Sequence, residues 1–123
     1  MNNEQRKNKR KTGSKGEDIA CEFISSIGYE IVERNYQFGH GEIDIIAKDG
    51  VTLVFIEVKY RMNLEFGPPE LSITKGKQNQ IRKTASAYLW ENEIKDQLSR
   101  IDVIAILQLG NQEPQINHII NAF

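Results

Sequence analysis

The sequence contains little cysteine and proline, and it has no long apolar run. Of its 123 residues, one is cysteine and three are proline. A lone cysteine, Cys21, excludes an intrachain disulfide and fits a reducing compartment such as the cytoplasm. No apolar stretch approaches the roughly 18 residues of a membrane-spanning helix. The basic start of the chain also lacks the apolar segment of a secretory signal. These absences predict one compact cytoplasmic domain with no membrane partner.

Several well-known functional motifs are absent as well. The sequence has no glycine-rich phosphate loop, no zinc-ligand spacing and no nucleophile elbow. His40 and His118 have no ligand-spaced partner, and Cys21 lies in a helical pattern without a neighbouring base. Zinc chemistry and covalent nucleophilic catalysis are therefore disfavoured.

Positive charge is concentrated at the N-terminus. Residues 1–12 hold five basic residues against Glu4, a net charge of +4, which leaves −5 for residues 13–123. One interpretation is a disordered, solvated tail followed by a single domain over residues 13–123. The other is a polybasic arm that binds nucleic acid through residues such as Arg10 and Lys11.

Apolar periodicity predicts two helices and five strands. The helical stripes are expected over residues 15–27 and, with Thr74 as the N-cap, up to Glu91. Two prolines and a glycine make residues 62–72 a loop. Three strands before the second helix and two after it predict a mixed sheet with helices packed on it. The expected strands cover residues 29–37, 39–47, 51–61, 100–109 and 114–123.

The third expected strand, "VFIEVKYR", is apolar on both faces and becomes charged at its end. Glu57, Lys59 and Arg61 share one of its faces, because strand side chains alternate. Asp49-Gly50 predicts a two-residue hairpin loop, which would place Asp44 opposite Phe55 and Glu42 opposite Glu57. Asp44 and Glu57 would then be diagonal neighbours, with Lys59 beside them.

Clustered carboxylates repel one another unless one is protonated or a cation binds. Oxygen ligands without histidine or thiolate suit Mg²⁺ or Mn²⁺. Such an ion can polarise a phosphodiester and activate water, and a neighbouring lysine can stabilise the developing charge. The structural alternative is an ordinary ion pair between Glu57 and Lys59, with Asp44 a solvated acid.

The spacing of Asp44 and Glu57-Val58-Lys59 across a hairpin resembles the PD-(D/E)xK motif of restriction-endonuclease-like nucleases. The chain is more closely similar to the YraN family of bacterial proteins. This resemblance covers about Gly13 to Ile106. It rests on "GSKGEDIA", "ERNY", "GHGEIDIIA", "VFIEVKYR", "FGPPE", "KQNQIRKTASAYL" and "RIDVIAI". It implies a restriction-endonuclease-like α/β fold, with a central mixed sheet flanked by helices.

The resemblance also implies roles for individual residues. Asp44 and Glu57 match metal-binding acids, and Lys59 matches the catalytic lysine. Glu17 matches a first-helix glutamate that joins the acidic site in the similar Holliday-junction resolvases. Lys77 matches a family lysine four residues before Ile81, which either contacts nucleic acid or is a helix surface charge. We also expect Arg61, on the strand face of Lys59, to contact nucleic acid. Ile43 stands where the motif has proline.

Three functional hypotheses follow from these patterns. The first is an endonuclease that depends on Mg²⁺ or Mn²⁺ and acts on DNA, with branched or structured DNA as an expected substrate and a homodimer as an expected assembly. The second is a non-catalytic nucleic-acid-binding or adaptor protein that retains the nuclease fold. The third is a metal-binding structural domain with a protein partner.

Overall fold

The computed structural model describes residues 3–65 and 67–123, with side chains from Lys15 onward except at 66, 71 and 72. It confirms the predicted α/β class with a five-stranded mixed sheet. In chain order, the elements are α1 (Asn3–Ser26), β1 (Glu30–Phe38), β2 (Gly41–Asp49), β3 (Thr52–Arg61), the 3-10 helix η1 (Pro69–Ser72), α2 (Lys75–Glu91), β4 (Ser99–Leu107) and β5 (Gln115–Ile119).

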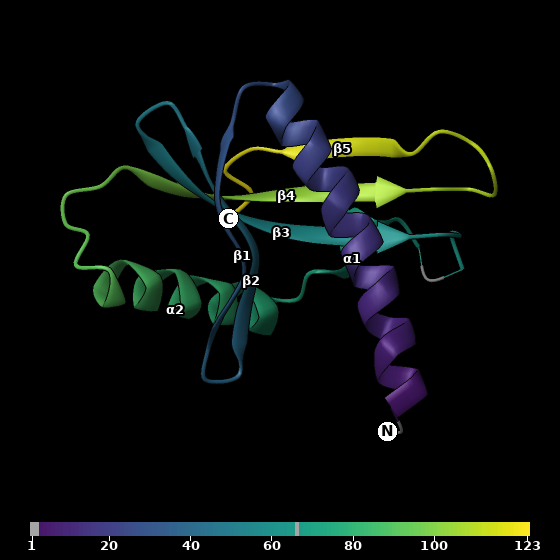
Figure 1. The fold of residues 1–123 in the computed structure, drawn as a ribbon, viewed down its shortest axis with the longest axis horizontal. Coiled ribbons are helices and arrows are strands. Elements are labelled where there is room, and N and C mark those ends of the chain that lie inside the picture. The colour runs from purple at the N-terminus through teal and green to yellow at the C-terminus, as the bar shows by residue number, and fades with distance from the viewer. Residues whose placement is uncertain (1–2, 66) are drawn as a thin grey trace.

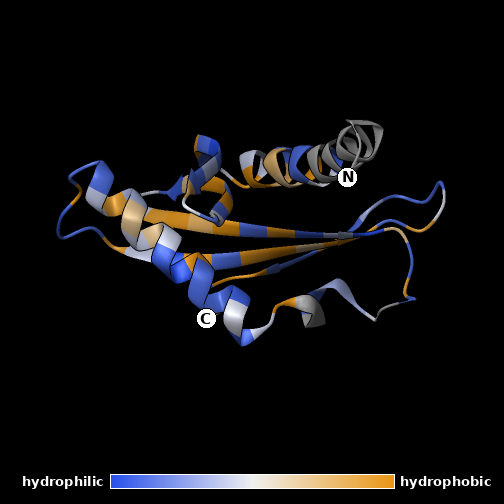
Figure 2. Ribbon diagram, turned by 90° about the horizontal axis from the view of Figure 1, so that it is seen from below, coloured by the Kyte–Doolittle hydropathy of each residue, from blue (hydrophilic) through white to orange (hydrophobic). Residues whose placement is uncertain are grey.

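The sheet has the strand order β1-β2-β3-β4-β5 and is covered on both faces. Only the β3–β4 pair is parallel, because α2 makes the crossover between them. Figures 1 and 2 show α1 on one side of the sheet and α2 with η1 on the other. We call these sides the α1 face and the α2 face. Burial on both faces explains why residues 53–56 of β3 are all apolar.

The first helix begins at Asn3, well before the expected start at Lys15. Residues 4–11 are mostly Glu, Gln, Lys and Arg, which have high helix propensity. This propensity outweighs the lack of an apolar stripe. The structure therefore continues the helix through residues 3–12, where we expected a disordered tail. The division of the chain into tail and domain at residue 12 stays a prediction. Met1 and Asn2 lie outside the described residues.

The second helix matches its prediction at both ends. The Thr74 hydroxyl accepts a hydrogen bond from the Lys77 backbone N–H at 3.1 Å, and the helix ends at Glu91. This N-cap satisfies one of the free N–H groups of the first turn. No helix among the described residues has both the length and the apolar character to cross a bilayer.

The hairpin between β2 and β3 differs from the prediction by two residues in its register. Gly50 and Val51 form its loop, so Asp49 pairs with Thr52 rather than lying in the turn. Asp49 is held in the strand by an ion pair with Arg100 (3.1 Å), and Gly50 takes the left-handed φ of 61°. Because the shift is even, the core side chains of residues 45–47 and 53–56 keep their predicted faces.

The β1–β2 hairpin turns sharply halfway along its length. Ile45 packs in the core on the α1 face, whereas Ile43, two residues earlier, packs in the core on the α2 face. In a regular strand these two side chains would share a face. The pairing of β2 with β3 ends at Ile45 and Ile56, and Figure 1 shows the hairpin running across the direction of β3 and β4.

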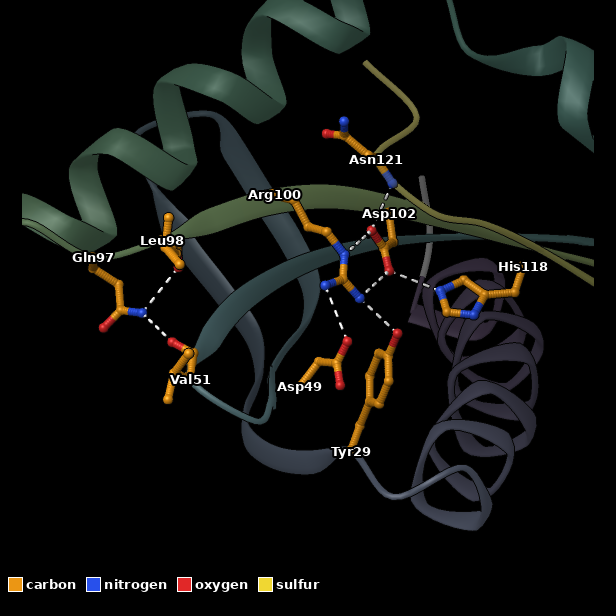
Figure 3. Close-up of polar contacts among 9 residues, drawn as sticks. All are labelled: Tyr29, Asp49, Val51, Gln97, Leu98, Arg100, Asp102, His118 and Asn121. Atoms are coloured by element: carbon orange, nitrogen blue, oxygen red, sulfur yellow. Dashed lines mark hydrogen bonds and ion pairs between the residues drawn. The ribbon is translucent and has the colours of Figure 1, made fainter.

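A second group of charged residues lies under α1 at the start of β4 (Figure 3). Asp102 is fully buried and accepts hydrogen bonds from the Arg100 guanidinium (3.0 and 3.3 Å) and the Asn121 backbone N–H (3.0 Å). His118 Nε2 lies 2.8 Å from Asp102 Oδ2, and Arg100 also donates to the Tyr29 hydroxyl at 2.6 Å. The residues of this Asp102 cluster come from three separate segments of the chain: Tyr29 before β1, the start of β4, and residues 118–121.

Candidate metal centre

Three carboxylates meet where the β1–β2 hairpin turns away from β3. Glu17 from α1 and Glu42 and Asp44 from β2 each place an oxygen within 4.8 Å of the others. Gly16 helps to bring α1 this close, because a Cβ there would meet the Tyr60 side chain on β3. We call Glu17, Glu42 and Asp44 the acid cluster. All three are partly buried, so their mutual repulsion is only partly screened by water.

Asp44 occupies the space that opens between β2 and β3. Its Oδ2 accepts a hydrogen bond from the Val58 backbone N–H at 2.8 Å, just beyond the last pair of the β2–β3 ladder. Burial, reinforced by the negative charge of Glu57, raises the pKa of Asp44 to about 8, and the Val58 hydrogen bond offsets this only in part. At neutral pH without a cation, this carboxyl therefore favours its protonated form.

Glu57 lies on the other side of Asp44 and is contacted by two lysines. Lys59 Nζ lies 3.8 Å and Lys77 Nζ 3.9 Å from Glu57 Oε1. Burial raises the pKa of Glu57, while Lys77, Lys59 and a side-chain hydrogen bond with Asp44 oppose that rise. Asp44 thus links the acid cluster to a carboxylate that already has cationic neighbours.

Arg34 on β1 was not predicted to take part in the site. Its Nη2 lies 3.4 Å from Glu17 Oε2 and 2.9 Å from Asp18 Oδ1. The guanidinium therefore holds Glu17 against β1, beside Asp44. The "ERNY" stretch, which contains Arg34, is part of the family resemblance. No local periodicity pairs residue 34 with residue 17, so this contact could not be predicted.

The structure places Glu17, Asp44, Glu57, Lys59 and Lys77 in one continuous group. It also adds Glu42, to which no role was assigned. The predicted metal pair was Asp44 with Glu57, whereas the closest three-carboxylate grouping is the acid cluster, without Glu57. The reason is the turn in β2, which brings residues 42 and 44 toward α1.

The remaining predicted nucleic-acid contacts are Arg61, Arg10 and Lys11. Arg61 lies at the end of β3, and its Nε is buried without a hydrogen-bond partner. The side chains of Arg10 and Lys11 lie outside the described residues. The roles of all three residues stay predictions.

The order and pairing of the strands and helices indicate the fold class of the protein. A meander of three antiparallel strands, a crossover helix and a parallel fourth strand are consistent with a restriction-endonuclease-like fold. Residues 16–106 match the model of the uncharacterised protein family UPF0102, and the chain belongs to that family.

Relatives share this family assignment over almost their whole length. A UPF0102 protein of Geotalea daltonii is 50% identical over 118 residues, covering 95% of this chain and 93% of its own. One from Geotalea uraniireducens is 46% identical over 123 residues, covering 100% and 97%. One from Caldicellulosiruptor saccharolyticus is 43% identical over 117 residues, covering 94% and 99%.

Proposed function

We propose that this protein is a divalent-metal-dependent endonuclease-like protein that binds DNA and hydrolyses phosphodiester bonds. The observation that carries the proposal is that the acid cluster, Glu57 and the two lysines form one continuous group. Three carboxylate oxygens lie within 4.8 Å of one another, and Asp44 connects them to Glu57 and its two lysines. A solvated surface ion pair would require neither the burial of Glu57 nor the crowding around Asp44.

The residues fit a hard cation such as Mg²⁺ or Mn²⁺. The acid cluster offers carboxylate oxygens only, and Asp44 lies close enough to Glu57 for that residue to supply another. A bound divalent ion would supply Lewis-acid activation of a phosphodiester and of water. The surplus of negative charge at Asp44 is what such an ion would relieve.

The chain's own residues would perform the remaining tasks. Lys59 and Lys77 approach Glu57 from β3 and from the first turn of α2, and both remain partly exposed. Their ammonium groups can therefore bind and orient a phosphate while staying on one side of the acids. Lys59 would stabilise the negative charge that develops on the phosphate during cleavage. Arg34 would keep Glu17 directed toward Asp44.

Calorimetric titration with Mn²⁺, followed by cleavage assays on linear, flapped and four-way DNA, tests the proposal. We expect Asp44→Asn to lose metal affinity and Lys59→Ala to keep metal affinity but lose cleavage. Asp96→Asn and Lys83→Ala remove the same charges from exposed positions outside the group and should change neither property. The proposal is wrong if the wild-type protein binds no Mn²⁺ at millimolar concentration and cuts none of these substrates.

The non-catalytic alternative predicts a different pattern. A protein that only binds nucleic acid would bind DNA more tightly after Asp44→Asn without metal, because phosphate would meet less negative charge. It would also show no cleavage with Mg²⁺ or Mn²⁺. The basic residues of α1 would then supply most of the affinity, with a steep dependence on salt.

A further inference from the structure

Asn35 has an unusual backbone conformation for a residue in the middle of a strand. Its φ is 56°, in the left-handed region that residues other than glycine seldom occupy. Residues held in such conformations persist where the surrounding structure imposes them, and they are frequent at functional sites. The Asn35 side chain is exposed, so a role for this residue rests on its backbone conformation.

The register places Asn35 level with Asp44. Arg34 pairs with Ile45 and Tyr36 pairs with Ile43, so residues 35 and 44 occupy the position between these pairs. The side chains switch from one sheet face to the other at this level in β2, as Ile43 and Ile45 show. The left-handed residue thus coincides with the sharp turn of the hairpin.

The two neighbours of Asn35 point to opposite helices. Arg34 Nη2 reaches Asp18 and Glu17 on α1 at 2.9 and 3.4 Å. The Tyr36 hydroxyl donates to Glu91 Oε1 on α2 at 2.7 Å. In a regular strand both side chains would reach the same helix. The conformation of Asn35 therefore fixes the hairpin to both layers at once.

We propose that Asn35 is a positioning residue for the acid cluster: its left-handed backbone turns the β1–β2 hairpin so that Glu42 and Asp44 meet Glu17. This inference rests on the proposed function, because it assigns the turn to the assembly of a divalent-metal site. Without the turn, Arg34 and Tyr36 could not both keep their partners. Asp44 would also lose its place beside the Val58 N–H.

The test compares Asn35→Gly with Asn35→Val in the full chain. Glycine adopts a positive φ readily, whereas a β-branched residue resists it. We expect N35G to bind Mn²⁺ within about twofold of wild type. N35V should bind about 10-fold more weakly or worse, the usual loss when a residue that orients metal ligands is changed. Asp96, exposed and with a φ of 54°, provides the matched control. D96V imposes a comparable backbone conflict away from the site and should leave Mn²⁺ affinity unchanged.

Hydrogen exchange of the Val58 amide adds a readout that does not depend on metal. Its protection should fall in N35V toward that of Asp44→Ala, which lacks the acceptor, and should persist in N35G and D96V. Wild-type protection in N35V, or equal loss of Mn²⁺ affinity in D96V, would overturn the inference. If the wild-type protein binds no Mn²⁺, the proposed function fails, and Val58 protection alone then decides whether Asn35 positions Asp44.

Discussion

Two carboxylates of the sheet lie in very different surroundings: Asp44 on β2 is partly buried, and Asp102 on β4 is fully buried. Asp102 accepts hydrogen bonds from Arg100 and Asn121 and lies against His118, so both of its oxygens have partners. Asp44 has the Val58 N–H as its donor and faces Glu17, Glu42 and Glu57. The charge of Asp102 is compensated by its partners, and these contacts join separate segments of the chain. The excess negative charge around Asp44 instead favours a bound cation, which the chain does not itself provide.

The largest expected loss of stability follows from removal of Asp102, the carboxylate whose charge is compensated. Asp102→Ala should lower the free energy of unfolding by about 3–5 kcal/mol, because it leaves the Arg100 charge buried without its main partner. Urea denaturation followed by circular dichroism measures the loss. Asp49→Ala removes a more exposed partner of the same arginine and should cost at most about 1 kcal/mol. Equal losses in the two variants would contradict the structural role given to Asp102.

A smaller effect is expected where the hairpin contacts α2. Gly41 lies so close to the Thr84 hydroxyl that a Cβ could not fit. Gly41→Ala should therefore cost about 1–3 kcal/mol through overpacking. Adding Thr84→Ala should recover part of that loss, since the clashing oxygen is gone. Differential scanning calorimetry of both variants checks this, and a double variant no more stable than G41A would argue against the contact.

Removal of the uncompensated charge of Asp44 should change stability in the opposite direction. Asp44→Asn keeps the shape of the side chain and an oxygen for the Val58 N–H but removes repulsion from the neighbouring acids. Without metal, the free energy of unfolding at neutral pH should stay the same or rise. Urea denaturation in the presence of a chelator measures it. A loss as large as that of Asp102→Ala would erase the distinction between the two carboxylates.

The most specific expected effect is a dependence of stability on pH. The folded-state pKa of Asp44 is raised from 3.8 to about 8, so its contribution to stability is fully present below about pH 4 and is lost as the pH rises toward 8. Wild type should therefore lose stability relative to D44N across this window. Mn²⁺ affinity should rise across it, because binding requires the carboxylate. Parallel pH profiles for the two proteins would contradict the raised pKa.

Much of the fold could be predicted from the sequence, because it depends on local patterns. Apolar alternation located the strands, and Thr74 marked the start of the second helix. The Asp-Gly pair indicated a hairpin whose even loop preserved the faces. The register itself could not be predicted, since the position of Asp49 depends on Arg100, a residue distant in sequence.

The candidate site was predicted less completely. Asp44, Glu57 and Lys59 follow from one hairpin and a motif resemblance, but the inclusion of Glu42 depends on a turn at Asn35 that no residue pattern announces. Arg34 joins Glu17 through helix packing. The Asp102 cluster unites three segments that are separate in sequence, so it could not be predicted from local patterns.

The parallel pairing of β3 with β4 has a consequence for how the chain folds. It joins Leu53 to Ser99, and α2 and its connections lie between them. In contrast, the β1–β2 and β2–β3 hairpins, which share the strand of Glu42 and Asp44, close over short loops. During synthesis, residues 17–59 emerge from the ribosome together and can pair before β4 exists. Until then, β3 is an open edge that is apolar on both faces, which is a template for aggregation. The nascent chain is therefore most vulnerable in the interval between the completion of β3 and the arrival of β4.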